Sequence, residues 1–408
     1  MKWFMVLGAG EFQLPLIRAA KAKGMSVAVV SIAGDYPGFA EADARVICDV
    51  RDKEAVLKAA REYEICGIAT DQTDLPVPTV AYVASQLGLP GMKEEVALNF
   101  TDKARMRQLC SRAGLPTIPA CQAGSVEEAK TFFRRIGASA ILKPVDNQGS
   151  RGVYRVDSEK ELEDKFWRAA AYSGKKEVIL EKYIQGQELE VDSLVAGGKV
   201  AVLATGEIYQ FSLPDTFSSY LRLYPARFPD ETAVQLERIN RETIHALGMK
   251  QGITHGEYIK GEDGEIYLIE IAARGGGNFI SSHIIPYCSG LHTEAFIVDM
   301  ATHYELEMPM LNWTEGAVCC RSFYLPEGWV ETVEGVEKLD EDPDVLVHSL
   351  HKIHLGKNGV KNLDKTSRFT IVLKAESTCA LKEKIAWAQK TVNIQVRCGN
   401  RLTGPIWQ

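Results

Sequence analysis

Two glutamates interrupt apolar stretches whose alternation is typical of β-strands: Glu257 in GEYI and Glu270 in YLIEIA. The turn GEDG lies between the two stretches, which therefore read as neighbouring strands. A buried carboxylate is costly unless it is paired or bound to a cation, and carboxylate oxygens are ligands that Mg²⁺ prefers. The pair predicts a magnesium site, although each glutamate alone could also be a salt-bridged acid of the core.

Groups that bind anions surround these glutamates in the sequence. Arg274 follows Glu270 and precedes Gly275, Gly276, Gly277 and Asn278. A guanidinium and exposed backbone amides can hold a carboxylate or a phosphoryl group. His255 lies two residues before Glu257 on the same strand, so the two side chains share a face. It could border the substrate or be a structural histidine.

A third candidate is the segment KPVDNQGSRGV, residues 143–153, in which Lys143 precedes a polar run with two glycines. Glycines let backbone N–H groups approach an anion closely, and the lysine adds a positive charge. Phosphate binding is one interpretation and an ordinary hairpin loop is the other. The segment is not a Walker loop, because no Gly-Lys-Ser/Thr closes it.

The elements that must position these residues fall into three regions. Residues 1–99 alternate short apolar strands with helical periodicity, which predicts βαβ units and a parallel sheet. Residues 100–311 predict a two-layer α+β domain whose first helix has Thr101 as its N-cap. Residues 312–408 predict a smaller α+β domain. The expected fold class is thus α/β followed by α+β.

Bulk composition excludes several classes of protein. The 408 residues are 46% hydrophobic and 25% charged, as in an ordinary globular protein, and the formal charge of −7 argues against nucleic acid as a partner. Nine cysteines without a C-x-x-C pair favour neither a zinc site nor a secreted disulfide framework. We found no long apolar run, so we expect no membrane partner and a cytoplasmic location by default.

The order of these parts resembles the ATP-grasp superfamily: a Rossmann-like start, the helix start at Asp102-Lys103, Lys143 before a glycine-bearing loop, EKYIQGQE, and the Glu257/Glu270 strand pair. THGEY followed by IEIAARGGGN is most similar to the L-amino acid ligases and related carboxylate–amine ligases. The resemblance implies an N-terminal Rossmann-like (pre-ATP-grasp) domain, an ATP-grasp core with a mobile lid lobe at about residues 115–182, and a small α+β C-terminal domain.

The resemblance also implies roles for residues that would bind ATP. Lys103 and Lys143 would contact its phosphates, and the loop from Asp146 to Gly152, with Gly149 and Ser150, would close over them. Adenine would bind at a hinge formed by Glu181, Lys182, Tyr183 and Ile184. The carboxylate of Glu188 would accept hydrogen bonds from the ribose hydroxyls.

For the chemical step the resemblance implies that Glu257 and Glu270 hold Mg²⁺, with Arg274, Lys143 and His255 as catalytic candidates. Arg274, Gly276, Gly277 and Asn278 would bind the substrate. The implied reaction turns a small carboxylate, such as an amino acid, into an acyl phosphate and transfers the acyl group to an amine. A homodimer is common among the proteins that this chain resembles.

Two departures and three alternatives stay open. Ala272 stands where many superfamily members have a metal-binding asparagine, although the amino acid ligases share the alanine, and residues 207–227 match no pattern. An ATP-grasp carboxylase or formate-dependent transformylase, and a regulator that binds ATP without turnover, are alternatives. An NAD-dependent dehydrogenase is a third, resting only on Gly8-Ala9-Gly10, a turn followed by Gln13 where the dinucleotide fingerprint has glycine.

Overall fold

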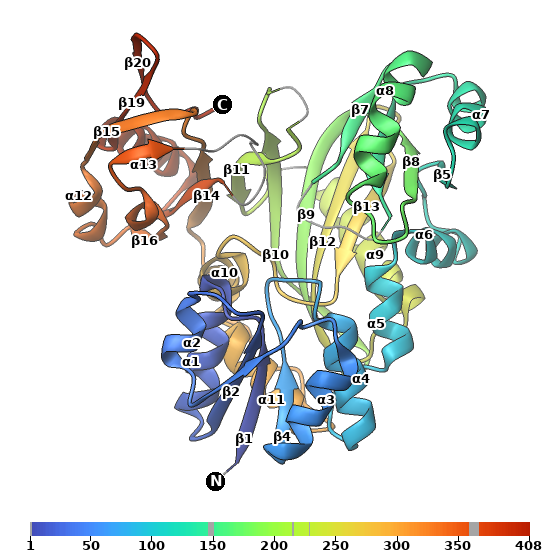
Figure 1. The fold of residues 1–408 in the computed structure, drawn as a ribbon, viewed down its shortest axis with the longest axis vertical. Helices are drawn as coiled ribbons and strands as arrows, with labels where there is room; N and C mark the ends of the chain where they lie inside the picture. The colour runs from blue at the N-terminus through green and yellow to red at the C-terminus, as the bar shows by residue number, and fades with distance from the viewer. Residues whose placement is uncertain (1, 146–150, 214–215, 228, 359–366) are drawn as a thin grey trace.

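The protein is described from a computed structural model that covers residues 2–145, 151–213, 216–227, 229–358 and 367–408. The chain begins with a four-stranded parallel sheet of order β3-β2-β1-β4, which lies at the lower end in Figure 1. Its strands are runs such as WFMVL and SVAVVS that are buried on both faces, as expected for a parallel sheet between helices. The strands are β1 (Trp3–Leu7), β2 (Ser26–Ser31), β3 (Ala44–Ile47) and β4 (Ile65–Ala69).

Helices from two distant parts of the chain pack on this sheet. The local ones are η1 (Glu11–Gln13), α1 (Leu14–Ala22), α2 (Pro37–Glu41), α3 (Lys53–Glu62) and α4 (Val77–Leu87). The distant one is α11 (Thr293–Thr302), which packs against α1 and β4. A Cβ at Gly67 of β4 would lie only 2.8 Å from the carbonyl oxygen of Ala301, so this close approach requires glycine. A helix from the predicted second region therefore completes the N-terminal layer.

The glycine turn after β1 is filled by the chain itself. The side chain of buried Gln13 accepts a hydrogen bond from the N–H of Gly10 (3.1 Å) and donates one to the carbonyl of Asp71 (2.8 Å). Gly8 has φ +102°, and a Cβ there would come within 3.0 Å of the Gln13 side chain. The turn thus serves local packing, which removes the one observation that favoured a dinucleotide site.

Two helices lead from this layer into a second lobe. They are α5 (Glu94–Thr101) and α6 (Lys103–Arg112), so the predicted division at residue 99 falls inside α5. The predicted N-cap at Thr101 is wrong. Asp102 caps α6, because its side chain accepts a hydrogen bond from the N–H of Arg105 at 3.0 Å.

The second lobe is a four-stranded sheet of order β5-β8-β6-β7 with two helices. Both helices begin at a serine whose hydroxyl caps the first turn, Ser125 and Ser158. The lobe consists of β5 (Ala120–Ala123), α7 (Val126–Ile136), β6 (Ala140–Pro144), β7 (Tyr154–Val156), α8 (Glu159–Ala170) and β8 (Val178–Lys182). It therefore lies within the range predicted for a lid lobe.

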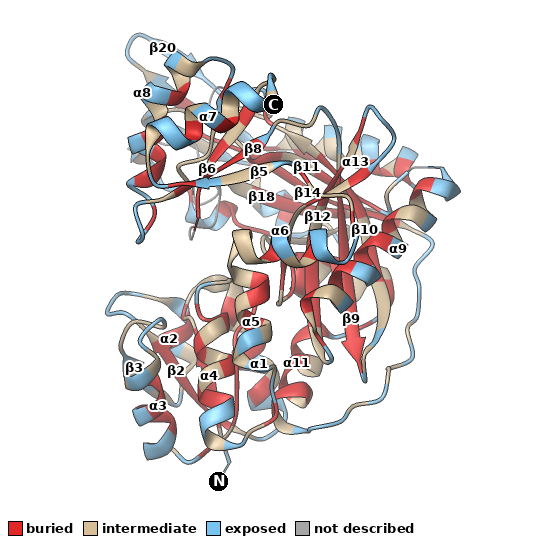
Figure 2. Cartoon of the chain, turned by 90° about the vertical axis from the view of Figure 1, so that its right-hand side faces the viewer, coloured by how far each residue is buried: buried red, intermediate tan, exposed pale blue. Residues whose placement is uncertain are grey.

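An eight-stranded sheet of order β13-β12-β9-β10-β11-β14-β18-β16 forms the centre of the molecule. Its buried strands appear as the red layer in Figure 2. The first five strands in chain order, with the helix that packs against them, are β9 (Gly186–Ala196), β10 (Lys199–Gln210), β11 (Ser219–Tyr224), α9 (Asp230–Leu247), β12 (Gly252–Gly261) and β13 (Ile266–Ala272). They are followed by η2 (Ile280–Ile284) and α10 (Ile285–Ser289).

The C-terminal region is continuous with this central sheet. Its strands β14 (Ala317–Phe323), β16 (Val345–His348) and β18 (Phe369–Ala375) extend it, beginning with the pairing of β11 and β14. A separate four-stranded sheet of order β17-β15-β19-β20 covers one end. Its elements and the neighbouring helices are β15 (Gly328–Glu334), α12 (Val336–Asp340), η3 (Leu350–Lys352), β17 (Gly356–Asn358), α13 (Thr378–Thr391), β19 (Asn393–Cys398) and β20 (Arg401–Thr403). Residues on both sides of the predicted division at 312 thus share one sheet.

Within the described part of the chain, every helix is too short or too polar to cross a lipid bilayer.

Candidate active site

Three glutamates form a row across adjacent strands of the central sheet. Glu270 of β13 is the cross-strand partner of Glu257 of β12, and Glu257 is in turn the partner of Glu190 of β9. Cross-strand partners project from the same face of a sheet. The structure therefore brings Glu257 and Glu270 together as the sequence predicted, and it adds a third acid.

Arg222 of β11 holds part of this row in place. Its Nη2 donates to Oε1 of Glu257 at 2.7 Å, and its Nη1 donates to Oε2 of Glu190. Burial alone would lower the pKa of Arg222, but the two glutamates raise it well above its usual value. Gly206 of β10 makes room for the pair, because a Cβ there would meet Oε1 of Glu190 at 2.8 Å.

His255 lies beside the same row. Its Nδ1 is 3.0 Å from Oδ1 of Asp192, and its Nε2 is 3.6 Å from Oε1 of Glu257. Burial by itself would lower the pKa of His255, but the attraction of Asp192 and further acids raises it to about 9. The imidazole is thus charged at neutral pH and held by carboxylates. It is placed to orient Glu257, and a charged imidazole is a poor metal ligand.

Among the described residues, Glu190, His255 and Glu257 are grouped closely enough to hold a metal ion, with ligand atoms within 4.8 Å of one another. Since Mg²⁺ prefers oxygen ligands, the carboxylates of Glu257 and Glu270 are a better match for magnesium than the imidazole of His255. The donor set of this row therefore fits the predicted ion.

The two predicted phosphate-binding lysines approach the site from different elements. Lys103, the first residue of α6, lies 2.8 Å from Oε1 of Glu270. Lys143 of β6 lies 2.6 Å from Oε2 of Glu181. Coulombic attraction by Glu270 raises the pKa of Lys103 although burial opposes it. Both lysines line one cavity.

Glu181, only 2% exposed, is held by two cations. Arg107 of α6 donates to its Oε1 at 3.1 Å, in addition to the contact with Lys143. Burial would raise the pKa of Glu181, yet Arg107 and Lys143 lower it to about 2. This side chain is thus a structural anchor between α6 and β8, and it leaves the backbone of the segment for ligand contacts.

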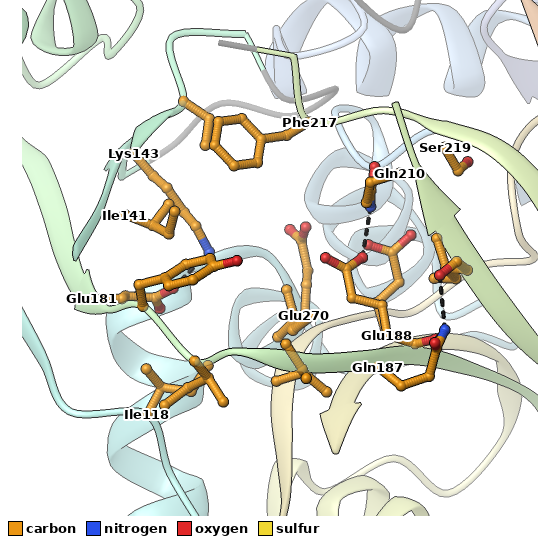
Figure 3. A pocket seen from close by; sticks show the side chains of 18 of the residues that line it. Ile118, Ile141, Lys143, Glu181, Gln187, Glu188, Gln210, Phe217, Ser219 and Glu270 are labelled. Atoms are coloured by element: carbon orange, nitrogen blue, oxygen red, sulfur yellow. Dashed lines mark hydrogen bonds and ion pairs between the residues drawn. The ribbon is translucent and has the colours of Figure 1, made fainter. Parts of the chain in front are cut away.

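A cavity of about 450 Å³ joins these groups, and Figure 3 shows its interior. One side is apolar, with Ile118 and Ile141, and the other carries Glu188, whose Oε2 accepts a hydrogen bond of 2.6 Å from Gln210. A flat apolar base and a polar sugar have matching surfaces in such a cavity. The residues predicted to bind ATP that line it are Lys103, Lys143, Glu181, Lys182, Tyr183, Ile184 and Glu188.

The glycine-bearing loop is only partly described. Gly149 and Ser150 lie outside the described residues, so the structure says nothing of their predicted role. Gly152 has φ +74°, and a Cβ there would lie 2.7 Å from the ring of Tyr172, so this position requires glycine. Its neighbours Arg151 and Val153 line the cavity.

A second cavity of about 230 Å³ adjoins the first. The two cavities share four lining residues: Arg151, Arg222, Glu257 and Glu270. The second cavity is also lined by residues that were predicted to bind or border the substrate: His255, Arg274, Gly277 and Asn278. The predicted metal ligands therefore form the boundary between the two spaces.

Arg274 is oriented by the N-terminal layer. Its Nε and Nη2 each donate to Asp74 at 2.8 Å, and Asp74 lies in the connection after β4. The glycines beside it are needed for close packing. A Cβ at Gly275 would meet Oγ of Ser281 at 2.2 Å, and one at Gly276 would meet Nδ1 of His255 at 2.9 Å. Gly276 thus supports His255, while it is absent from the lining of the second cavity.

Sequence reasoning missed several of these groups. Arg222 lies in the segment 207–227, which matched no pattern, and Asp74 lies in an unremarkable loop. Arg107 carried a usable signal, because it is four residues after Lys103 and the two share a helix face. Arg222 and Asp74 lie at no such spacing from a predicted site residue.

Comparisons with known proteins agree with this geometry. Residues 136–283 match the family model described as an ATP-grasp domain. Alanine–anticapsin ligase of Bacillus subtilis is 26% identical over 270 residues, which cover 61% of this chain and 55% of that protein. The chain spans about half the length of these curated relatives.

Solved structures match over nearly the whole chain. An L-amino acid ligase from Bacillus licheniformis superimposes with a TM-score of 0.83 at 21% identity, covering 98% of this chain and 99% of that one. The biotin carboxylase domain of 2-oxoglutarate carboxylase from Hydrogenobacter thermophilus, solved with MgADP and bicarbonate, has a TM-score of 0.76 at 20% identity, covering 96% and 90%. The fold predicted from the order of motifs is confirmed by these likenesses.

Proposed function

We propose that this chain is an ATP-grasp protein and acts as an ATP-dependent carboxylate–amine ligase, because residues 136–283 match the ATP-grasp domain model and the whole fold resembles that of an L-amino acid ligase. In the proposed reaction the γ-phosphoryl group of ATP moves to a substrate carboxylate. An amine then attacks the acyl phosphate, and an amide or peptide bond forms with release of ADP and phosphate. The relatives named as amino acid ligases support this choice of reaction.

The observation that carries the proposal is the shared wall of the two cavities. Glu257 and Glu270 line both the larger cavity, which suits a nucleotide, and the smaller one, which contains Arg274. A phosphoryl group passing between a nucleotide and an acid must cross such a boundary. Positioned cations at this point would stabilise the charge that develops during transfer.

Each side chain has a defined part in this proposal. Lys103 and Lys143 would bind the ATP phosphates, and the segment Glu181 to Ile184 would receive adenine beside Glu188. Glu257 and Glu270 would hold magnesium, which when bound supplies charge neutralisation along the polyphosphate. Arg274, fixed by Asp74, would bind the acid and face the tetrahedral intermediate, while His255 would orient Glu257.

The second cavity has room for small organic substrates. Its volume of about 230 Å³ exceeds several-fold the ~30 Å³ that one water occupies in the liquid. A homodimer belongs to the same proposal, and sedimentation of the purified protein tests it.

The deciding experiment is a screen for ADP release with MgATP and amino acids or other small carboxylates, singly and in pairs, followed by mass spectrometry of the products. We expect ADP only where a carboxylate and an amine are both present, with a product lighter than their sum by one water. ADP release that needs bicarbonate or formate would instead support the carboxylase or transformylase alternative. Nucleotide binding without ADP release from any pair would support the non-catalytic regulator.

A further inference from the structure

Arg368 lies immediately before β18 and lines the second cavity, although the chemistry proposed above does not use it. Its Nη1 donates to Oγ of Ser218 at 3.0 Å and to the carbonyl of Ser219 at 3.1 Å. Its Nε is buried and has no acceptor within the described parts of the chain. The guanidinium is thus held by neutral groups at Nη1, while its Nε–H has no acceptor among the described residues.

Arg368 also differs from the two neighbouring arginines, Arg222 and Arg274, in its ion pairing. Arg274 is paired with Asp74, and Arg222 with Glu190 and Glu257. No carboxylate of the described residues lies within ion-pair distance of Arg368. Burial lowers the pKa of Arg368 to about 10, and repulsion by Arg222 adds to the effect. Glu257 attracts the charge of Arg368 only from beyond ion-pair distance, so an anion in the cavity would offset part of the cost of burying this cation.

Asn278 supplies a second unused donor at the same cavity. Thr370 Oγ1 donates to its Oδ1 at 2.8 Å, which fixes the amide so that Nδ2 is the remaining group. That Nδ2 is buried and, like Nε of Arg368, has no acceptor in the described structure. Thr370 follows Arg368 by two residues, so the start of β18 positions both donors. Two N–H donors suit the two oxygens of a carboxylate.

Arg274 already accounts for the reacting acid in the proposed function, and it lines the same cavity as Arg368 and Asn278. Arg368 and Asn278 are absent from the lining of the nucleotide cavity, whereas Glu257 and Glu270 line both cavities. The two donors are therefore left for a second anionic group of the substrate.

We propose that Arg368 and Asn278 bind a second, non-reacting carboxylate, so that the enzyme selects substrates that carry this extra negative charge. The group belongs either to a dicarboxylic acid that is activated or to an amino acid that serves as the amine. This inference rests on the proposed function, which defines the carboxylate that reacts. Binding of the second carboxylate can be measured without turnover.

The first test is calorimetry with the full chain, Mg²⁺ and a nonhydrolysable ATP analogue. The acid probes are malonate, succinate and glutarate against the monocarboxylates propionate and butyrate, and the amine probes are the common amino acids against their amides. We expect wild type to bind at least one probe that has the extra carboxylate about tenfold or more tightly than its counterpart without that carboxylate. The series that shows the preference identifies the source of the carboxylate.

Arg368→Gln should remove that preference, Arg368→Lys should retain part of it, and Asn278→Ala should weaken it. Lys374→Gln is the matched control, because Lys374 lies on the same strand and lines neither substrate nor nucleotide cavity. Binding of the ATP analogue by each variant reports that the fold is intact. In the ADP-release assay, Arg368→Gln should raise KM for the charged substrate about tenfold or more and leave KM for ATP unchanged.

Several results would overturn the inference while leaving the proposed ligase intact. They are equal binding by wild type of probes with and without the extra carboxylate, no saturable binding of any probe, or an unchanged preference in Arg368→Gln. Failure of the proposed function differs from all of these, because the ATP analogue would not bind or no substrate pair would release ADP.

Discussion

The guanidinium of Arg274 and the carboxylate of Asp74 are 200 residues apart in the sequence, and two hydrogen bonds of 2.8 Å join them. Asp74 follows β4 of the N-terminal sheet, and Arg274 follows β13 of the central sheet. The N-terminal layer therefore contributes directly to the second cavity, by setting the direction in which the side chain of Arg274 points.

Asp74→Asn should reduce kcat/KM for the acid about 10- to 100-fold, because an amide cannot hold the guanidinium as a paired acceptor and a misplaced group loses its orientation. KM for ATP should change little. Steady-state ADP release measures both constants. Asp49→Asn, which alters an exposed ion pair with Arg51 in the same layer, is the control. Equal losses in the two variants would contradict the positioning role.

Glu270→Gln should lower kcat by about 100-fold or more, because it removes an anionic oxygen ligand where magnesium is proposed and a counter-charge of Lys103. The measurement is ADP release across a magnesium titration, in which the variant should need a higher concentration. Glu265→Gln, an exposed glutamate of the same hairpin, should behave as wild type. Full activity of Glu270→Gln would remove the assigned metal site.

Lys143→Ala should weaken binding of the ATP analogue about tenfold or more, because it removes a lysine from the cavity where we propose that the ATP phosphates bind. Calorimetry with ATP and AMP analogues distinguishes a phosphate contact from a general loss, since AMP should be affected less. Lys160→Ala, an exposed lysine on α8 of the same lobe, is the matched control. An unchanged dissociation constant for ATP would contradict the assignment.

The buried Glu181 predicts a dependence of stability on pH. Its pKa is lowered from 4.5 to about 2 in the folded protein, so ionised Glu181 stabilises the fold above pH 4.5 by on the order of 3 kcal/mol. That contribution should fall as the pH falls below 4.5 and should vanish near pH 2. Urea unfolding of wild type and Glu181→Gln between pH 6 and 3 measures it. A difference in unfolding free energy that does not shrink toward pH 3 would contradict the ion pairs with Arg107 and Lys143.

The groups that carry local signals were identifiable before the fold was known. Glu257 and Glu270 each interrupt an apolar alternation, and a short turn between strands leaves antiparallel pairing as the simplest arrangement, so their adjacency followed from spacing alone. Lys143 was marked by the glycines after it. The helix start was misassigned by one residue, because Thr101 and Asp102 are both good caps and the observed hydrogen bond to Arg105 is made by the second.

Other groups could not be predicted because their partners come from remote segments. Arg222 is explained only by Glu190 and Glu257 on strands β9 and β12, and Arg368 only by a cavity built from several elements. Each looks in the sequence like any arginine of a half-buried strand. Their burial and their neighbours depend on the order of strands in the sheet, which no local period encodes.

By itself the sequence determined the parallel N-terminal layer, the ATP-grasp order of motifs and the acid pair, because hydrophobic period, turn residues and costly buried charges act over a few residues. Only the tertiary structure decided which cations those acids meet, that α11 completes the first layer, and that β14, β16 and β18 extend the central sheet. Burial and Coulomb energies depend on distances in space, and the fold brings Arg274 and Asp74 into contact although they are far apart in the sequence.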